Sequence, residues 1–458
     1  MRRLFGTDGI RGVAGEYPLD KKTIYAIGRA LGDHLPQGPK RVVIGQDTRE
    51  SSSWIADMLA AGMGQSGVEV ASAGVIATPG VAYLAHSRRF SAGVVISASH
   101  NPWQDNGIKV FGGDGYKLAD QTELEIEKEI FSLLEAAAAT TAAAGKSGAS
   151  WASSLPGDER LRAGYIEWLA HPIAGAGALQ AVVDCANGAA SAIAPEVLTR
   201  CGLRAEFTHS RPDGRNINAH CGALHPEVVG REAVARKADL GICFDGDADR
   251  ALFTDAMGRV VNGDAVMLLL ARELQRRGEL AQNTVVATTM SNMGLETALR
   301  EYGIRMLRAP VGDKYVLEEM QKSGAVLGGE QSGHIILSRA ATTGDGLLTA
   351  IQVLEVVARS GKSLAELVAD LRVFPQTIKN IRVREKRPFD QIPEVQAAIR
   401  SAEQELNGSG RVNVRYSGTE AMARVMVEAA TEATVERLAA SITGAIEKSL
   451  GTGAPSSH

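Results

Sequence analysis

Residues 240–254 read LGICFDGDADRALFT, and they set three carboxylates between two short apolar segments. Residues 240–244 and 251–254 have the length and apolar character of buried strands. The loop between them carries aspartates at alternate positions, which point to one side of an extended segment. Three carboxylates this close repel one another unless a cation neutralises them. The stretch therefore predicts two strands joined by a cation site.

We expect Asp245, Asp247 and Asp249 to bind one cation, and ligands that are all oxygen favour Mg²⁺, Ca²⁺ or Mn²⁺ over zinc. An EF-hand is excluded, because its sixth and twelfth positions need Gly and Glu, where this chain has Arg250 and Ala256. A solvated acidic turn is the alternative, and the apolar segments on both sides disfavour it.

Similar apolar segments recur along the first 370 residues, with helix-like patterns between them. Further predicted strands are residues 41–45, 93–96, 181–184, 284–287 and 325–327, and predicted helices include residues 24–35 and 54–59. This alternation predicts an α/β fold in which helices cover largely parallel sheets.

Changes in composition divide the chain into four predicted domains. Residues 136–154 are rich in Ala, Thr, Ser and Gly, as linkers are, although their first part could extend the preceding helix. After residues 372–375 the predicted order becomes helix, strand, strand, helix, and residues 451–458 are expected to be a frayed tail. We expect three sequential layered α/β domains and a smaller C-terminal α+β domain, with bounds 1–154, 155–253, 254–368 and 369–458.

Composition narrows the class of protein. The 458 residues are 45% apolar and 22% charged, which argues against a disordered chain or a coiled coil. The net charge of −4 gives no basic excess for nucleic acid or a membrane surface. No apolar run approaches the ~18 residues of a membrane span, and no signal peptide is evident. Four cysteines form no disulfide framework, so we expect a cytoplasmic enzyme.

A second loop with chemical character is SASHNP at residues 97–102, directly after a predicted strand. A hydroxyl at a strand end, beside His100, is a candidate nucleophile. Ser97 and Ser99 lie on one face of the strand, so this pattern does not choose between them, and a plain hydroxyl turn is the alternative. Lys109 could bring positive charge to the same site or be a solvated lysine.

Two further loops suggest a phosphorylated sugar. In GGEQSGH, residues 328–334, Glu330 and Ser332 offer the groups that bind a sugar diol, and a glycine hairpin is the alternative. In RYSGTE, residues 415–420, hydroxyls and a glycine stand among arginines, as in an anion nest, and an ordinary turn is the alternative. The predicted phosphate contacts there are Arg415, Ser417, Gly418, Thr419 and Arg424.

Residues 5–12, FGTDGIRG, form either another phosphate contact through Arg11 or a tight first turn.

Two other kinds of site are disfavoured by the sequence. The spacing of His220, Cys221 and His225, with Cys201 nearby, matches no usual zinc pattern. No Walker-type phosphate loop is present, so an ATP kinase is disfavoured. One loop falls in each predicted domain, and a cleft where domains meet would serve phosphoryl transfer on a phosphosugar.

These four loops, in this order, resemble those of the α-D-phosphohexomutase superfamily from Phe5 to about Ser449. The segments FGTDGIRG (5–12), TMSNMGLE (289–296) and GEQSGH (329–334) are most similar to those of its bacterial phosphoglucosamine mutases. The resemblance implies a heart-shaped, four-domain fold. It also implies interconversion of glucosamine 6-phosphate and glucosamine 1-phosphate through a 1,6-bisphosphate, a step towards UDP-N-acetylglucosamine and the cell wall. Phosphomannomutase or phosphoglucomutase activity is the alternative within the superfamily.

The resemblance also assigns roles to residues. It selects Ser99, directly before His100, as a phosphoserine. It implies one Mg²⁺ per subunit, held by a phosphoserine oxygen and the three aspartates, a hexose 1,6-bisphosphate primer and a possible homodimer. The implied contacts of the reacting phosphate are Arg11, His100, Lys109 and Arg250, those of the sugar hydroxyls are Glu330 and Ser332, and those of the other phosphate are Arg415, Ser417, Gly418, Thr419 and Arg424.

Two positions depart from the superfamily pattern. Ala248 stands where Gly is usual, so a backbone with positive φ there would be strained. Ala421 replaces the usual Pro after Glu420, which would loosen the phosphate loop. Two other classes stay open: a haloacid-dehalogenase-like phosphatase with Asp245 as nucleophile, and a sugar-phosphate sensor without catalysis.

Overall fold

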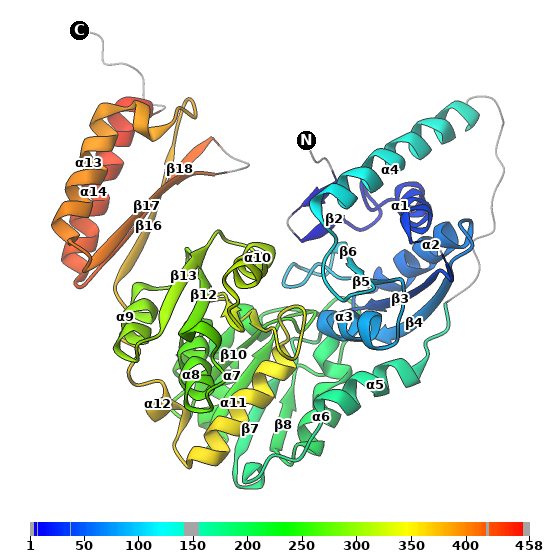
Figure 1. The fold of residues 1–458 in the computed structure, drawn as a ribbon, viewed down its shortest axis with the longest axis horizontal. Coiled ribbons are helices and arrows are strands. Elements are labelled where there is room, and N and C mark those ends of the chain that lie inside the picture. The colour runs from blue at the N-terminus through cyan, green and yellow to red at the C-terminus, as the bar shows by residue number, and fades with distance from the viewer. Residues whose placement is uncertain (1–3, 7, 37, 142–154, 418–420, 452–458) are drawn as a thin grey trace. The chain divides into compact units, whose positions relative to one another are not determined.

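The computed structural model describes residues 4–6, 8–36, 38–141, 155–417 and 421–451. The chain divides into two compact units (Figure 1). The first comprises residues 1–290 and 303–369, and the second comprises residues 291–302 and 370–458.

The first sheet of the larger unit has the strand order β1-β2-β6-β5-β3-β4. Val42 and Ile44 share a core with α1 and α2 on one face. Gly45 and Gly93 let α3 approach the other face, because a Cβ at either position would collide with Val81. The elements are β1 Phe5–Gly6, β2 Gly9–Val13, α1 Lys21–His34, β3 Arg41–Gln46, α2 Ser52–Gly64, β4 Glu69–Val75, α3 Thr78–Ser87, β5 Ala92–Ile96, β6 Asp105–Gly112 and α4 Asp120–Thr141.

The second sheet has the order β11-β10-β9-β7-β8. Its elements are α5 Glu159–Leu169, β7 Gln180–Asp184, α6 Ala194–Arg200, β8 Arg204–Thr208, α7 Pro226–Ala235, β9 Leu240–Phe244, β10 Ala251–Asp255 and β11 Val260–Val261. Short 3₁₀ helices occur at η1 Ala176–Ala178, η2 Ala189–Ala192, η3 Gly222–Leu224, η4 Ala281–Asn283 and, in the smaller unit, η5 Phe389–Gln391.

The third sheet has the order β13-β12-β14-β15. Its elements are α8 Gly263–Arg276, β12 Thr284–Thr288, β13 Arg305–Ala309, α10 Asp313–Ser323, β14 Leu327–Gly329, β15 Ile335–Leu337, α11 Gly346–Ser360 and α12 Leu364–Leu367.

The expectation of largely parallel sheets is wrong. In each of these sheets three neighbouring strands are parallel and reach one edge: β5, β3 and β4 in the first, β9, β7 and β8 in the second, and β13, β12 and β14 in the third. The remaining strands are antiparallel, as β9–β10 and β14–β15 are. The physical reason is loop length, because residues 245–250 are too few for the crossover that parallel neighbours need.

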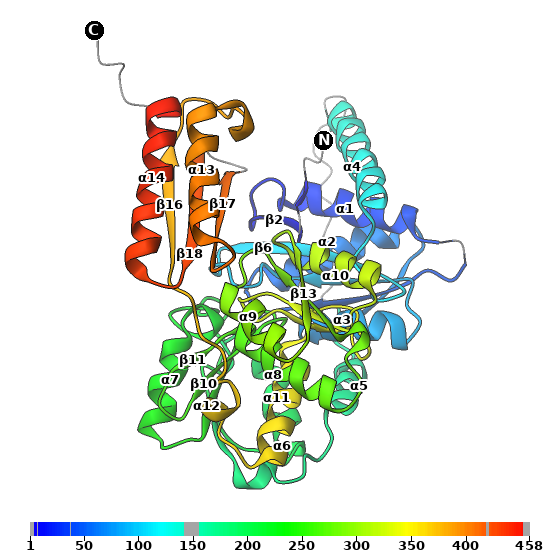
Figure 2. The same ribbon diagram turned by 60° about the vertical axis from the view of Figure 1, so that its left-hand side comes forward.

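The smaller unit has an antiparallel sheet of order β16-β18-β17, with α13 and α14 side by side against one face (Figure 2). Its elements are α9 Met293–Glu301, β16 Gln376–Arg382, α13 Pro393–Leu406, β17 Gly410–Tyr416, β18 Met422–Ala429 and α14 Glu432–Leu450. Strand β16 is absent from the predicted order, because most of its residues are exposed and no apolar run marks it.

The predicted linker and tail fall mostly outside the described residues. Helix α4 extends to Thr141, as the composition of residues 136–141 allowed, whereas residues 142–154 and 452–458 are not described. In the described part of the chain, no helix has both the length and the hydropathy needed to cross a membrane.

Candidate active site

Ser99 lies just beyond β5, and its hydroxyl faces the aspartate loop that follows β9. Its Oγ donates a hydrogen bond of 2.6 Å to Asp245 Oδ2 and lies 3.4 Å from His100 Nδ1. Ser97 is engaged differently, since its Oγ donates to Asp47 Oδ2 at 2.6 Å and accepts the Ser99 N–H at 2.9 Å. The two candidate serines therefore have different surroundings: Ser97 bonds to Asp47, whereas Ser99 bonds to Asp245 in the predicted metal loop.

Asp47 and Arg49 are partners of this loop that the sequence analysis missed. Their side chains form a fully buried ion pair. Arg49 also donates to the carbonyl oxygens of Ser99 at 3.1 Å and Asn101 at 2.6 Å, and Asn218 donates to the same two oxygens at 2.9 and 3.1 Å. The sequence does carry one signal for them, a charged pair directly after a predicted buried strand. The parallel pairing of β3 with β5, which sets those residues beside Ser97 and Ser99, is visible only in the structure.

The three predicted metal ligands come together. One carboxylate oxygen from each of Asp245, Asp247 and Asp249 lies within 4.8 Å of the other two, and all three residues are buried. Within the described chain, the Oδ1 atoms of Asp247 and Asp249 are buried and have no hydrogen-bond partner. Burial, together with Asp249 and Asp247, raises the pKa of Asp245 well above its usual range. Buried, unpaired oxygens that repel one another fit a divalent cation with oxygen ligands.

Lys109 lies beside this cluster and is buried. Its Nζ lies 2.8 Å from Asp247, 2.9 Å from Asp8 and 3.6 Å from Asp249. Burial opposes its charge, but these three carboxylates raise the pKa of Lys109 well above its usual range. Lys109 is therefore a fixed cation rather than the solvated lysine that was the alternative.

Two arginines and a histidine complete the surroundings of Ser99. Arg11 donates to the carbonyl oxygen of Ala98 at 3.3 Å, and Arg250 Nη1 lies 3.3 Å from His100 Nδ1. Burial first, and then the charges of Arg250 and Arg11, lower the pKa of His100 to about 4. His100 is thus neutral near pH 7, and the two guanidinium groups provide the positive charge.

A cavity of about 430 Å³ opens beside these groups. That volume lies within the range of about 300–1,000 Å³ that is typical of small-molecule sites. Its lining includes Arg11, His100, Asp249, Arg250, Glu330 and His334. Glu330 accepts hydrogen bonds from Gly312 N at 3.1 Å and from Ser332 Oγ at 3.3 Å. The structure therefore brings the predicted sugar loop to the cavity that Arg11, His100 and Arg250 also line.

Further charged groups at the cavity went unassigned in the sequence. Lys117 Nζ lies 2.6 Å from Asp8 and 2.5 Å from Asp313, joining the first turn of the chain to the start of α10. His334 accepts a hydrogen bond from Gly344 N at Nε2, and its Nδ1 lies 3.6 Å from Asp249. His334 ends the predicted sugar loop, residues 328–334, but the pattern of residues along the sequence does not predict its contact with Asp249.

The fourth predicted loop belongs to the smaller unit. Arg415 and Arg424 stand directly opposite each other on β17 and β18. Like charges in that position are destabilising, which favours an anion between them. Ser417 is buried, and Lys386 Nζ donates to its carbonyl oxygen at 2.6 Å. Gly418 and Thr419 lie outside the described residues.

The sequence matches models of one known protein family along most of its length. Those of phosphoglucomutase/phosphomannomutase match four successive segments: alpha/beta/alpha domain I at residues 2–137, domain II at 163–258, domain III at 262–374 and the C-terminal domain at 378–445. The chain belongs to the phosphoglucomutase/phosphomannomutase family. The predicted superfamily, the four-domain α/β architecture and the enzyme class are thereby confirmed.

Individual members of the phosphoglucomutase/phosphomannomutase family are similar over almost the whole chain. A phosphoglucosamine mutase of Koribacter versatilis (strain Ellin345) is 59% identical over 458 residues, which cover 98% of each protein. One of Solibacter usitatus (strain Ellin6076) is 50% identical and covers 98% of this chain and 99% of its own. The crystal structure of a Burkholderia thailandensis family protein superposes with a TM-score of 0.77 at 26% identity, covering 96% of this chain and 97% of that one.

Proposed function

We propose that this chain is a phosphoglucosamine mutase, which interconverts glucosamine 6-phosphate and glucosamine 1-phosphate through phosphorylated Ser99. The similarity to relatives of that name supports the substrate. The observation that carries the reaction type is the Ser99 hydroxyl, 2.6 Å from Asp245 at the buried aspartate cluster and beside the cations Lys109 and Arg250.

The reaction consists of two phosphoryl transfers. In the first, the O1 hydroxyl of the 6-phosphate attacks the phosphorus of phosphorylated Ser99. The O1–P bond forms and the P–Oγ bond breaks, while the proton of the O1 hydroxyl passes to Ser99 Oγ through solvent, which gives the 1,6-bisphosphate and an unphosphorylated Ser99. In the second, the phosphoryl group on O6 passes to Ser99 Oγ, and O6 takes a proton. The products are the 1-phosphate and an enzyme that is phosphorylated again.

The residues around Ser99 provide charge and position for both transfers. Lys109, Arg11 and Arg250 stabilise the negative charge on the transferring phosphoryl oxygens. Asp245, Asp247 and Asp249 would hold Mg²⁺, which supplies further electrostatic stabilisation of those oxygens when bound. The backbone that carries Ser99 is fixed by Arg49 and Asn218, so the oxygen that accepts phosphorus keeps its place between transfers.

The intermediate must turn end for end, so the sugar contacts have to accept either orientation. Glu330 and Ser332 are suited to this, because a carboxylate and a hydroxyl bind any adjacent pair of sugar hydroxyls. Arg415, Ser417, Gly418, Thr419 and Arg424 remain the predicted contacts of the non-reacting phosphate. A hexose 1,6-bisphosphate primer, a homodimer and a cytoplasmic location also remain predictions.

The test is a ³¹P NMR assay with Mg²⁺ and a trace of glucose 1,6-bisphosphate. Glucosamine 6-phosphate, glucose 6-phosphate and mannose 6-phosphate run in parallel. We expect a new anomeric-phosphate signal, strongest with the amino sugar. Ser99→Ala should abolish it, and Ser53→Ala, an exposed serine, should leave it unchanged.

Other outcomes of this assay contradict the proposal in distinct ways. A stronger signal from the mannose or glucose phosphate moves the chain to another specificity of the superfamily. Release of inorganic phosphate indicates a phosphatase. No conversion by the folded protein in any tube indicates a sensor.

A further inference from the structure

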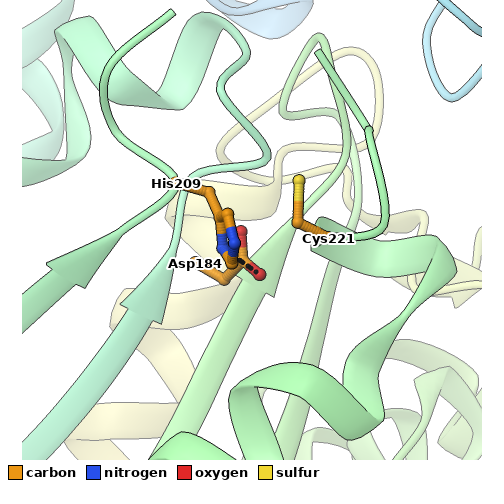
Figure 3. Close-up of side chains that lie close together, drawn as sticks. All are labelled: Asp184, His209 and Cys221. Atoms are coloured by element: carbon orange, nitrogen blue, oxygen red, sulfur yellow. Dashed lines mark ion pairs between the residues drawn. The ribbon is translucent and has the colours of Figure 1, made fainter. Parts of the chain in front are cut away.

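A second cluster of metal-ligating side chains lies in the larger unit, apart from the residues that line the cavity. Asp184 ends β7, His209 follows β8 directly and Cys221 precedes η3. One ligand atom from each lies within 4.8 Å of the other two, and Figure 3 shows the three side chains close together. The spacing of residues along the sequence disfavoured a zinc site around Cys221. Spacing does not reveal ligands that lie far apart in the sequence and come together only in the fold.

The carboxylate of Asp184 is held in place before any ligand arrives. Its side chain is fully buried. Its Oδ1 accepts a hydrogen bond from Ala186 N at 2.8 Å, and its Oδ2 accepts one from Gly222 N at 3.0 Å. Carboxylate oxygens have further lone pairs, so these contacts orient Asp184 without using up its capacity to bind a cation.

His209 offers a buried nitrogen and a route from solvent. Its Nδ1 lies 3.0 Å from Asp184 Oδ2, an ion-pair distance, but this buried nitrogen has no well-directed hydrogen bond to a described residue. Its side chain is 32% exposed, whereas that of Asp184 is buried, so the imidazole faces both the carboxylate and the surface. A buried ring nitrogen beside a fixed carboxylate is suited to coordination.

Cys221 contributes the third donor. It is fully buried, and burial raises the pKa of its thiol to about 12. A protonated thiol without solvent access is a poor nucleophile, so a catalytic cysteine is excluded here. The sulfur is instead available as a soft ligand that gives up its proton when it bonds to a metal.

We propose that Asp184, His209 and Cys221 form a second metal site, which binds a divalent transition metal of the zinc class through one oxygen, one nitrogen and one sulfur. Mixed donors of this kind suit zinc, whereas the oxygen-only aspartate cluster suits Mg²⁺. Bond lengths of about 2.0–2.3 Å set ligand atoms of one zinc about 3–4 Å apart, so only small shifts are needed. Water would take the fourth position on the exposed side of His209.

The charges of this step balance. Formation of the sulfur–metal bond breaks the S–H bond of Cys221, and the proton passes to solvent. The thiolate and the carboxylate of Asp184 then neutralise the dication. The site therefore buries no net charge, which is the condition for a stable ion in a protein interior.

The site would also support the loop that carries Ser99. Asn218, whose side chain donates to the Ser99 and Asn101 carbonyl oxygens, lies between His209 and Cys221 in the chain. A metal that joins His209 to Cys221 would brace the segment that presents Asn218. We therefore expect zinc to raise the melting temperature of the full-length protein.

The test is a Co²⁺ titration of the full-length protein in saturating Mg²⁺, which occupies the aspartate cluster. We expect one equivalent of Co²⁺ to give the near-ultraviolet band of cobalt–thiolate bonding, and Zn²⁺ to remove it. Cys221→Ser should abolish the band, and His209→Ala should weaken Co²⁺ binding at least tenfold. Cys201→Ser, another free buried cysteine, and Asp247→Asn should keep it.

The proposal is overturned if the wild-type protein gives no thiolate band, or if the band survives Cys221→Ser. It is also overturned if His209→Ala binds Co²⁺ as tightly as the wild type. Should Cys221→Ser fail to fold, the wild-type titration and the His209→Ala variant decide the question. None of these readouts depends on mutase activity, so they stand or fall independently of the proposed function.

Discussion

Ala248, in the middle of the aspartate loop, has a backbone φ of 54°. This is the left-handed region, which costs a residue with a Cβ about 1–2 kcal/mol. The superfamily resemblance had marked Ala248 as a departure from Gly that would be strained at positive φ, and the structure shows that its φ is positive. The loop accepts this strain in a buried setting beside the carboxylates.

Replacing Ala248 with Gly should therefore stabilise the protein. Relief of strain exceeds the extra flexibility of Gly in the unfolded chain, which costs about 0.5–1 kcal/mol. We expect the free energy of unfolding in urea to rise by about 0.5 kcal/mol. Ala61→Gly, inside α2, is the control and should lower it by about 1 kcal/mol. If Ala248→Gly lowered the free energy of unfolding as much as Ala61→Gly does, the backbone at Ala248 would not be strained.

Asp345 is a buried carboxyl group whose stability effect depends on pH. It caps α11 by accepting Leu348 N at 2.9 Å, and it accepts the Tyr165 hydroxyl at 2.7 Å. Burial raises the pKa of Asp345 to about 6. The folded state thus binds this proton more tightly than the unfolded state, so the contribution of Asp345 to stability is lost as pH rises from about 4 through about 6.

Asp345→Asn removes this titration but keeps the cap. We expect the free energy of unfolding of the variant, relative to wild type, to increase by about 1–3 kcal/mol between pH 4 and pH 7. Asp20→Asn, which changes the N-cap of α1, controls for the cap itself. A difference between variant and wild type that is the same at both pH values would refute the assignment.

Single elements explain what the sequence could and could not predict. Strands β9 and β10 were predicted almost to their bounds, because both are apolar and buried. Strand β14 begins at Leu327 and ends in glycines, so its predicted bounds were shifted towards the N-terminus. Asp47 and Arg49 escaped prediction because their contacts depend on the pairing of β3 with β5, which no local pattern reveals.

Arg49 joins β3 to the Ser99 loop, and its loss should destabilise both. Arg49→Met leaves Asp47 buried without its charged partner, which costs about 3–5 kcal/mol. Chemical denaturation should show that loss, and Asp47→Asn combined with Arg49→Met should recover part of it. Arg29→Met, which breaks an exposed pair with Asp33, should change stability by less than about 1 kcal/mol. An equal effect of the two single variants would contradict the role of burial.

Across the whole molecule, the order of the four loops carried more information than any one of them. Each loop alone had an ordinary alternative, but together they predicted the family that the comparisons show. The domain bounds 1–154, 155–253, 254–368 and 369–458 stay a prediction. The structure adds that α9 packs with the smaller unit, where Asn292 donates to Phe374 O at 3.0 Å. Local residue patterns do not reveal that a helix from the middle of the chain packs with the C-terminal unit.

A metal ion bound at the aspartate cluster should contribute to both the activity and the stability of the whole chain. Chelation with EDTA should abolish turnover, and Mg²⁺ should restore it. At a Mg²⁺ concentration of 100 times its Kd, the folded protein should gain about 2.7 kcal/mol. Thermal denaturation should show this gain for the wild type and a much smaller one for Asp247→Asn. Full turnover in EDTA would contradict the metal site.

Transfer of phosphate from Ser99 to the sugar is the central claim, and one single-turnover experiment tests it most directly. The protein is phosphorylated by the primer, separated from it and mixed with glucosamine 6-phosphate. The proteolytic peptides of the protein are then analysed by mass spectrometry, and the sugar phosphates by ³¹P NMR. When the phosphate on Ser99 comes from an ¹⁸O-labelled primer, we predict that the label leaves the Ser99 peptide and appears on O1 of the sugar, while Ser99 receives unlabelled phosphate from O6. Phosphate on another residue, or its release as inorganic phosphate, would contradict the account.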